Sequence, residues 1–282
     1  MTNSELTVII TTFKSESKID SCLDSIDSSI KIIVVENSSN HKFKEYIEQK
    51  YSNTECVLTN ENLGYGKANN IGLKKAKSKY CLILNPDTIL DKEAIKNFLA
   101  SAQKNKNFHI IAPLQSKDEF SKNNIFKDNT TALETNNVEG FAMFLNMEKF
   151  SEIGFFDENI FLYLEEIDLC KRIINVKGTI LIDPSIKIFH FGAQAVNKAF
   201  SHEVELTRNW HWMWSLFYFN KKHYNFLYSL ALVFPKLFSA LLKSLFYKII
   251  FKNKKSELYK KRLSGLFNSI IGKNSWYRPN IK

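Results

Sequence analysis

Cysteine is scarce in this chain, which contains four among 282 residues. The four lie far apart among apolar neighbours, and no two of them form a C-x-x-C pair. That arrangement argues against a disulfide framework and against a paired thiolate site. We therefore expect small core residues of a protein in a reducing compartment: Cys22, Cys56, Cys81 and Cys170.

Signals for two phosphate-binding folds and for secretion are also missing. No G-x-G-x-x-G follows a strand-like run, which disfavours a dinucleotide fold, and no G-K-[ST] is present for a P-loop. The segment Met1–Glu5 has no basic stretch and leads directly into a strand-like run. We expect no signal peptide, and therefore a cytoplasmic protein.

Acidic residues are nearly absent from the last fifth of the chain. Residues 221–282 hold 14 lysines and arginines but one acid, Glu257, which leaves residues 1–220 with 25 basic and 28 acidic side chains. The formal net charge of +10 therefore belongs to the C-terminal part alone. This asymmetry indicates a separate tail with a separate partner.

Apolar runs alternate with helix-like segments in the N-terminal part. Strand-like runs cover Leu6–Thr12, Ile30–Val35, Glu55–Thr59 and Tyr80–Leu84. Between them lie the helix-like segment His41–Tyr51 and an apolar repeat that begins at Ile19, with Ser15 as its expected N-cap. This alternation predicts βαβ units and a parallel sheet. Right-handed crossovers would then place the polar strand ends along one edge of the sheet: Thr11–Phe13, Glu36–Ser38 and Asn85–Asp87.

The buried-strand pattern Tyr80–Leu84 ends at Asn85-Pro86-Asp87. Ligands of open α/β sheets bind beyond the carboxyl ends of the strands, where Asp87 would stand. Asn-Pro-Asp is also ordinary turn chemistry, so a turn without further function is the alternative. Just upstream, the glycine-rich segment Asn60–Gly72 places Lys67 near the start of a helix, where it could meet a phosphate. The alternative there is a glycine-rich turn with a solvated lysine.

Seven segments in order resemble the family 2 glycosyltransferases, especially bacterial rhamnosyltransferases of polysaccharide assembly. Four precede residue 90: VIITTF, IIVVENSS, N-E-N-L-G-Y-G-K-A-N-N-I-G and L-I-L-N-P-D-T. Three follow: Gly140–Phe144, Gly154–Glu158 and Phe161–Arg172. The placement of Ile188–Gly192 also matches, and the similarity covers about residues 5–195. The resemblance implies a GT-A nucleotide-sugar domain, that is, a mostly parallel central sheet flanked by helices.

The resemblance also implies a metal site and a catalytic base. A divalent cation, Mg²⁺ or Mn²⁺, would be held at Asp87, with His190 as a further contact. Asn85 stands where many members carry an aspartate. Glu166 stands at the base position, where an aspartate is more usual. Without the resemblance, His190 would more often be a core histidine, and acids at a helix N-terminus would complement its dipole.

Donor-binding residues follow from the resemblance in the same way. Thr11 and Phe13 would contact the nucleobase and ribose, with Phe13 where a tyrosine is frequent. Glu36 takes the usual aspartate position after the second strand. The remaining donor contacts would be Gly64, Lys67, Asn70 and Asn85. In contrast, Asp168 and Arg172 are spaced i, i+4 and are expected to form an ion pair within a helix or at the edge of the core.

The C-terminal part is aromatic, apolar and basic. Aromatic residues crowd between Trp210 and Phe219, and Phe226–Phe251 is mostly apolar. No stretch of about 18 residues within it is free of both lysine and proline, so a clean transmembrane span is not favoured. We expect an in-plane helix or helical hairpin on an anionic membrane surface through residues 221–262. A basic helical pair packed on the catalytic domain is the alternative, and nucleic-acid binding is not expected.

The sequence thus predicts a GT-A domain over 1–200 and a membrane-associating helical tail over 201–282. The predicted function is an inverting, metal-dependent transfer of a sugar from dTDP-rhamnose or a UDP-sugar to a lipid-linked or cell-surface glycan. It would take place peripherally on the inner face of the cell membrane, with residues 115–137 as a lid or acceptor loop. Two alternatives remain: an inactive membrane scaffold of the same fold, and a nucleotidyltransferase. The latter would carry a basic, glycine-rich loop after the first strand, but Thr12–Ser15 has no glycine.

Overall fold

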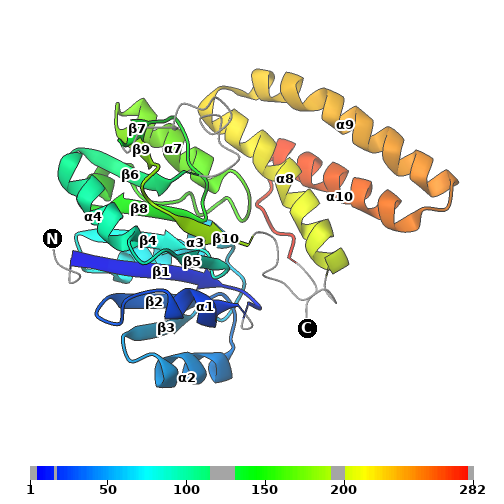
Figure 1. The fold of residues 1–282 in the computed structure, drawn as a ribbon. Coiled ribbons are helices and arrows are strands. Elements are labelled where there is room, and N and C mark those ends of the chain that lie inside the picture. Colours follow the sequence, from blue (N-terminus) through cyan, green and yellow to red (C-terminus); the bar gives the residue numbers. More distant parts are fainter. Residues whose placement is uncertain (1–4, 16–17, 115–130, 192–200, 279–282) are drawn as a thin grey trace. The chain divides into compact units, whose positions relative to one another are not determined.

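The computed structural model describes residues 5–15, 18–114, 131–191 and 201–278. The chain divides into two compact units, each described below by itself (Figure 1). The first unit comprises residues 1–63, 67–156 and 166–196. The second comprises 197–282 together with two short segments, 64–66 and 157–165. Most of the segment 115–137, expected above to be a lid, lies outside the described residues, as does Gly192.

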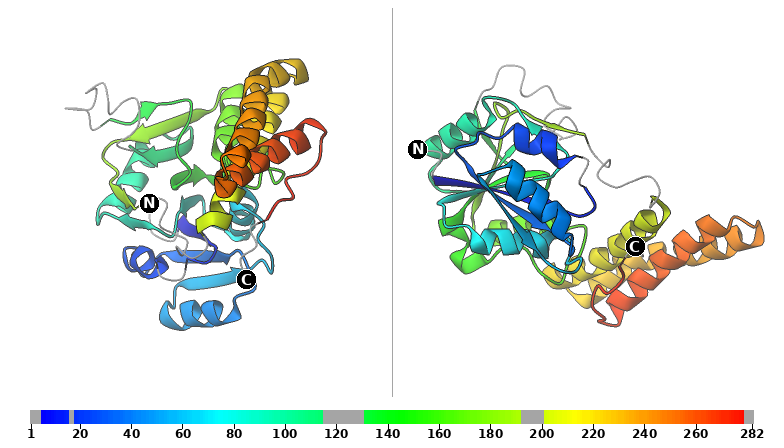
Figure 2. Two further views of the ribbon diagram at one scale, coloured as in Figure 1. Left: turned by 90° about the vertical axis from the view of Figure 1, so that its right-hand side faces the viewer. Right: turned by 90° about the horizontal axis from the view of Figure 1, so that it is seen from below.

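The first unit is built on an eight-stranded sheet with the strand order β3-β2-β1-β4-β8-β6-β9-β7. β1, β2, β3 and β4 are mutually parallel, β8 runs antiparallel between β4 and β6, and β9 is parallel to β6. Seen from below, in the right-hand view of Figure 2, the strands fan out with the usual twist. The strand bounds are β1 Leu6–Thr12, β2 Lys31–Glu36, β3 Thr54–Leu58, β4 Tyr80–Leu84, β6 Phe108–Pro113, β7 Leu133–Glu134, β8 Ala142–Asn146 and β9 Thr179–Asp183. The prediction of a mostly parallel sheet is confirmed.

Helices cover both faces of this sheet because its central strands are apolar on both sides. On one face, alternate residues of β1, such as Val8 and Ile10, share a core with α1, α2 and α4. On the other face, Ile33 and Val35 of β2 pack with Ala68 of α3. The helix bounds are α1 Ile19–Asp24, α2 His41–Lys50, α3 Tyr65–Lys75, α4 Ala94–Lys104, η2 Met147–Lys149, α6 Phe150–Ile153 and α7 Glu165–Asn175.

The expected N-cap at Ser15 is wrong. α1 begins at Ile19 after Lys18, without a side-chain cap, and the Ser15 hydroxyl instead donates to the carbonyl of Phe13 at 3.1 Å. The cysteine prediction holds: all four are free and buried. Burial is the main cause that raises the pKa of Cys22, Cys56, Cys81 and Cys170 to about 12. These thiols therefore stay protonated at neutral pH.

A two-stranded antiparallel sheet joins two distant parts of the first unit. β5 (Thr88–Leu90) follows the Asn-Pro-Asp segment, and β10 (Ile188–His190) pairs with it so that His190 lies opposite Thr88. The backbone N–H of Phe191 also donates to the carbonyl of Asp87 at 3.1 Å. The ladder therefore fixes His190 next to the residue that ends the turn after β4.

The second unit consists mainly of three long helices, α8 (Ser201–His223), α9 (Phe226–Ile249) and α10 (Asn253–Ile270). Side-chain hydrogen bonds join α8 and α10: among them, Trp210 Nε1 donates to Ser264 Oγ, and Ser269 Oγ donates to the carbonyl of Trp214. α9 and α10 pack against each other as a helical hairpin, and the apolar stretch itself is one helix that continues through Pro235. Among the described residues, α9 alone has the length and composition to cross a membrane, despite Pro235 and its lysines, and 22% of its most apolar window is buried.

Candidate functional site

The carboxyl ends of β1 and β2 hold a buried carboxylate. Glu36, which is 1% exposed, accepts hydrogen bonds from the hydroxyls of Thr12 and Ser38, both at 2.5 Å. The N–H of Asn37 donates to the carbonyl of Thr12 at 2.8 Å and closes the gap between the two strand ends. The neighbouring hydroxyl, that of Thr11, donates to Asn69 Oδ1 at 3.0 Å. The expected alignment of polar strand ends along one edge is therefore confirmed for these two strands.

The end of β4 joins the same edge because β4 pairs with β1, with Leu84 opposite Ile10. The carbonyl of Asn85 accepts from the N–H and the hydroxyl of Thr88, at 3.2 and 2.7 Å. These two bonds close the turn that the Asn-Pro-Asp sequence indicated. The N–H of Asn85 donates to the carbonyl of Phe141 at 2.9 Å. The segment is thus a turn, and it also presents a carboxylate at the strand ends.

That carboxylate faces an imidazole. Asp87 Oδ1 lies 3.4 Å from His190 Nε2, and the two side chains are 5% and 21% exposed. The ring of Phe141 stacks on the imidazole with 4.7 Å between centroids and 6° between planes. The stacking fixes the imidazole plane, while the β5–β10 ladder fixes its backbone. The structure therefore brings Asp87 and His190 together, as the resemblance implied.

The pair fits part of a divalent-cation site. A carboxylate oxygen and an imidazole nitrogen are both ligands that Mn²⁺ accepts, and the carboxylate also suits Mg²⁺. Within the described ranges, no group of three or more histidine, cysteine, aspartate or glutamate side chains could hold a metal. Two protein ligands leave most of the coordination sphere to other oxygens. A diphosphate would supply oxygens of the hard kind that such cations prefer.

Glu166 lies in the first turn of α7 and carries a perturbed carboxyl group. Burial raises its pKa, and the nearby carboxylate of Glu139 raises it further. Glu139 stands two residues before Phe141, whose ring covers His190. The segment from Glu139 to Phe141 therefore links the surroundings of Glu166 to the Asp87–His190 pair. A carboxylate with a raised pKa is a stronger base than an exposed one, as proton abstraction requires.

Asp168 and Arg172 form the structural pair predicted from their spacing. Arg172 Nε lies 2.9 Å from Asp168 Oδ2, and Asp168 is fully buried. The guanidinium also donates to the carbonyls of Ile153 and Phe155. These bonds fasten α7 to the segment that carries the Gly-Phe-Phe-Asp-Glu sequence.

The expected phosphate-side residues lie in or beside α3. Lys67 is in the first turn of this helix and is partly exposed. Asn70 is buried, and its amide donates to the carbonyl of Phe156 at 2.9 Å and accepts from the N–H of Phe156 at 3.0 Å. The amide thus holds α3 to a segment far away in sequence. Gly64 belongs to the second unit and has a positive φ of 84°.

Three residues of this site were not singled out by sequence reasoning. Asn69 accepts from Thr11, Glu139 raises the pKa of Glu166, and the Phe141 ring stacks on His190. Phe141 was read only as part of a motif, and the other two lie beside predicted residues without a chemical signal of their own. Their roles depend on side chains that meet across strands and helices, which one-dimensional spacing does not encode.

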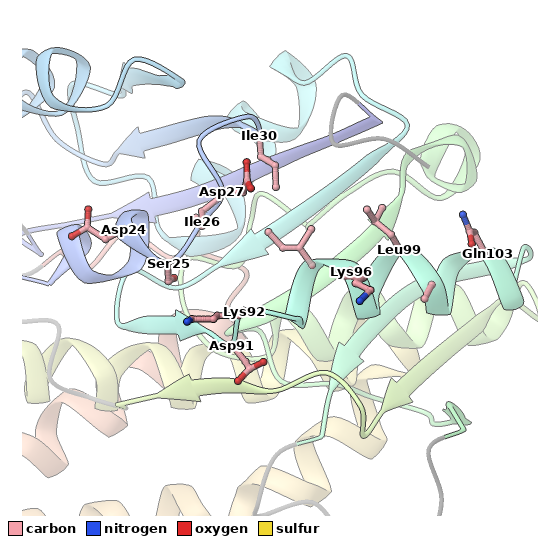
Figure 3. Close-up of a pocket in the computed structure, with 12 residues that line it drawn as sticks. Asp24, Ser25, Ile26, Asp27, Ile30, Asp91, Lys92, Lys96, Leu99 and Gln103 are labelled. Carbon is pink, nitrogen blue, oxygen red and sulfur yellow. The ribbon is translucent and has the colours of Figure 1, made fainter.

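A hollow of about 690 Å³ lies elsewhere in the first unit (Figure 3). Its side chains come from the end of α1, the residues after it and α4, and include Asp24, Asp27, Asp91, Lys92 and Lys96. None of its lining residues is a predicted site residue. The three carboxylates already accept hydrogen bonds, from Tyr51, Ser29 and the N–H of Glu93 respectively.

Comparison with known families gives one match over most of the sheet-bearing part. Residues 7–168 match the family model described as glycosyl transferase family 2. The match begins in β1 and ends in α7, so it includes the β1–β2 edge, the Asn-Pro-Asp turn and Glu166.

Two curated relatives are glycosyltransferases by name. The low-salt glycan biosynthesis hexosyltransferase Agl10 of Haloferax volcanii is 25% identical over 190 residues, which are 60% of this chain and 61% of that protein. The dTDP-rhamnosyl transferase RfbF of Shigella flexneri is 24% identical over 67% of this chain and 69% of its own. The aligned region thus spans less than two thirds of the length of the hexosyltransferase.

A solved structure shows the same fold over nearly the whole chain. It is the mannosyltransferase PcManGT of Pyrobaculum calidifontis in complex with GDP-Man and Mn²⁺, with a TM-score of 0.58 and 14% identity. The likeness covers 94% of this chain and 87% of that one. The mostly parallel sheet with flanking helices and a C-terminal helical region is therefore a GT-A-like fold.

Proposed function

The chain belongs to glycosyl transferase family 2, and from that premise we propose that it is an inverting transferase that moves a sugar from a nucleotide-diphosphate donor to a glycan hydroxyl. The observation that carries this proposal is the meeting of Asp87 and His190 beyond the carboxyl ends of the parallel strands. Ligands of open α/β sheets bind at such an edge. The donor is dTDP-rhamnose or a UDP-sugar, and the acceptor is a lipid-linked or cell-surface glycan.

The nucleotide end of the donor lies along the ends of β1 and β2. Phe13 offers a ring for the nucleobase, and Thr11 offers a hydroxyl at the same edge. The Glu36 carboxylate is fixed by two hydroxyl donors, so it is held ready to accept from the base or ribose. Lys67, in the first turn of α3, supplies a positive charge to the diphosphate. Asn70, Gly64 and Asn85 complete the proposed donor contacts.

Asp87 and His190 would hold a divalent cation, Mg²⁺ or Mn²⁺, together with the phosphate oxygens of the donor. Bound there, the cation would neutralise the negative charge that develops on the departing diphosphate. Many family members carry an aspartate where this chain has Asn85, so the proposed cation site has one negative charge fewer here. Binding of the cation should therefore depend strongly on the donor's own phosphates.

Glu166 acts as the general base in a one-step displacement. Its carboxylate takes the proton from the acceptor hydroxyl as that oxygen attacks the anomeric carbon and the bond to the diphosphate breaks. Attack from the face opposite the leaving group inverts the anomeric configuration. The raised pKa of Glu166 suits this task because it increases the proton affinity of the carboxylate.

We further propose that the helical unit brings the enzyme to an anionic membrane surface on the cytoplasmic side. α9 exposes many large apolar side chains, among them Leu227, Phe234, Phe238, Leu242, Leu245, Phe246 and Ile249. Exposed lysines follow at the start of α10: Lys252, Lys254, Lys255 and Lys260. Apolar area next to basic charge is the combination that binds anionic lipid interfaces. A lipid-linked acceptor would explain why a sugar transferase carries such a surface.

The decisive experiment measures nucleotide release from UDP-GlcNAc, GDP-mannose and dTDP-rhamnose, with and without Mn²⁺ or Mg²⁺. Each donor is also tested for a cation-dependent rise in melting temperature, because a ligand that binds only the folded state stabilises it. We expect one donor class to give both signals, and Asp87→Ala to abolish nucleotide release. Stabilisation by a donor without any turnover would favour the inactive scaffold instead.

A further inference from the structure

The segment Asp157–Glu165 has an unusual backbone immediately before Glu166. Tyr163 and Leu164 are consecutive residues with positive φ, 70° and 68°. Bulky side chains rarely adopt this left-handed region, because the Cβ atom approaches the backbone. Such a conformation persists only where surrounding contacts enforce it, and it is found preferentially at functional sites. The segment lies in the helical unit, whereas Glu166 begins the next part of the sheet-bearing unit.

Helix α8 supplies one set of enforcing contacts within that unit. The buried Ser215 hydroxyl donates to the carbonyl of Leu162 at 2.8 Å, directly before the two strained residues. The Tyr163 ring meets Trp212 edge-on at 5.5 Å between centroids. His211 stacks on Phe161 at 4.4 Å. One face of α8 therefore contacts three successive residues of the segment: Phe161, Leu162 and Tyr163.

The residues after α10 supply a second set. Ser275 Oγ donates to the carbonyl of Asn159 at 2.7 Å, and the Arg278 guanidinium lies 3.8 Å from the centre of the Phe161 ring. His211 Nε2 donates to the carbonyl of Tyr277 at 2.7 Å, which ties the residues after α10 to α8. Burial lowers the pKa of His211 to about 3, so the imidazole that contacts both Phe161 and Tyr277 stays neutral.

The start of the segment is anchored by charge. Asp157 Oδ2 accepts from the Tyr218 hydroxyl at 2.9 Å and from Lys222 at 2.7 Å, both on α8. Hydrogen bonding to Lys222 and Asn159 holds the pKa of Asp157 below its usual range in spite of burial, which is the largest influence and raises it. The carboxylate is therefore ionised and bound at neutral pH.

The same segment supports the glycine-rich loop before Lys67. The N–H of Tyr65 donates to the carbonyl of Phe161 at 3.1 Å. A Cβ atom on Gly64 would lie 2.2 Å from that carbonyl oxygen, so only glycine allows this approach. Phe161 therefore contacts the loop that precedes Lys67 and belongs to the segment that precedes Glu166.

We propose that Ser215, Ser275 and Arg278 are positioning residues that hold the 157–165 segment in the strained conformation from which the chain enters α7 at Glu166. This inference rests on the proposed function, because it concerns the placing of the proposed base. Its consequence is that the helical unit is needed for turnover itself, even with a water-soluble acceptor or with water. Membrane binding alone would give the helices no such effect.

A matched pair of serine substitutions tests this in the full chain. Ser215→Ala and Ser269→Ala each remove a buried hydroxyl that donates to a backbone carbonyl, at 2.8 and 2.9 Å. The Ser215 hydroxyl, on α8, donates to the 157–165 segment. The Ser269 hydroxyl, on α10, donates to α8 instead. Both changes should lower the melting temperature by similar amounts. The double variant S215A/S275A removes both hydroxyl anchors of the segment.

Two readouts separate positioning from stability. Hydrogen exchange followed by mass spectrometry should show faster exchange over residues 157–165 in S215A and more so in S215A/S275A, but not in S269A. Nucleotide release from the UDP-GlcNAc, GDP-mannose or dTDP-rhamnose that the wild type turns over should show kcat lowered roughly tenfold or more in the double variant. KM for that donor should change less than kcat does, since the β1–β2 edge proposed for the nucleotide is unchanged.

The positioning role is overturned if the double variant keeps the kcat of S269A, or if exchange over 157–165 does not differ between them. Either result would leave the proposed function standing, because the wild type would still turn over its donor. A wild type that releases nucleotide from none of the three donors, with or without Mn²⁺, would instead refute the proposed function, and with it the positioning role.

Discussion

His190 Nε2 lies 3.4 Å from Asp87 Oδ1, with the imidazole stacked on Phe141. The two residues meet because β10 pairs antiparallel with β5, and backbone bonds, not the side chains, set the register. Replacing one side chain should therefore leave the other in place. The relationship is thus open to clean mutational tests.

We expect Asp87→Asn and His190→Ala each to lower turnover of the donor by about 10²-fold or more, because each removes a proposed ligand for the cation that would offset charge on the leaving diphosphate. Steady-state nucleotide release at saturating donor would measure the loss. The rise in melting temperature on adding donor with Mn²⁺ should shrink in both variants. Asp91→Asn is the control, since Asp91 lines the other hollow and its carboxylate accepts from the N–H of Glu93. Normal turnover in D87N would contradict the assignment.

Glu166→Gln should strongly lower turnover and also stabilise the protein at neutral pH. Burial raises the folded-state pKa of Glu166 above the ordinary glutamate value of 4.5, so its ionisation lowers stability as pH rises from 4.5 through the folded pKa. Glutamine relieves that cost while removing the base, and we expect a loss of about 10²- to 10⁴-fold in kcat. Melting temperatures at pH 4 and pH 8 would show the stabilisation at pH 8 only. A destabilised E166Q at pH 8 would contradict the buried-carboxylate interpretation.

Glu139→Gln should shift the acid limb of the pH–rate profile to lower pH. The negative charge of Glu139 raises the pKa of Glu166, so removing it lets Glu166 ionise at lower pH. Turnover below the midpoint should rise and the plateau should change little. Measuring kcat from pH 4.5 to 8 would reveal the shift, with Glu134→Gln as a control on an exposed acid. An unmoved acid limb would show that Glu166 is not the group that titrates there.

The sheet could be predicted because its strands are apolar runs whose signal is local. Leu6–Thr12 was placed to the residue, and the apolar run that begins at Tyr80 is a buried strand, as expected. The start of α1 was misplaced because Ser15 bonds its own turn instead of the helix. The turn at Asn85–Asp87 could also be predicted, since proline and aspartate favour turns through their own local backbone geometry.

The pairing within the site was less accessible from sequence. Only the family resemblance linked Asp87 to His190, because nothing in either stretch marks the β5–β10 ladder. The amide of Asn70, expected near phosphate, holds the backbone of Phe156 instead, and its donor role stays a prediction. The hydrogen bond from Ser215 of α8 to the carbonyl of Leu162 could not be predicted. It depends on how the helix packs against backbone that is distant in sequence.

Gly64→Ala should destabilise the helical unit more than Gly272→Ala. Both glycines have positive φ, 84° and 78°, so alanine costs about 1 kcal/mol of backbone strain at each. A Cβ at Gly64 would also meet the carbonyl of Phe161 at 2.2 Å, whereas nothing lies within 4 Å at Gly272. We expect at least about 1 kcal/mol of additional loss at Gly64. Thermal unfolding of both variants would measure it, and equal midpoints would show that the close approach is not maintained in solution.

Neutralising the basic start of α10 should weaken binding to anionic vesicles. The exposed residues Lys252, Lys254, Lys255 and Lys260 each contribute about 1 kcal/mol near a charged surface, so changing all four to glutamine should lower the partition constant by more than about 10²-fold at low salt. Co-sedimentation with phosphatidylglycerol vesicles would show the loss, and phosphatidylcholine vesicles should bind wild type and variant alike. A control variant changes four exposed lysines of the sheet-bearing unit: Lys42, Lys77, Lys92 and Lys104. Equal weakening in both variants would mean that net charge, and not this surface, governs the attraction. Undiminished binding in the α10 variant would leave the apolar face of α9 as the main contact, because buried apolar area does not depend on salt.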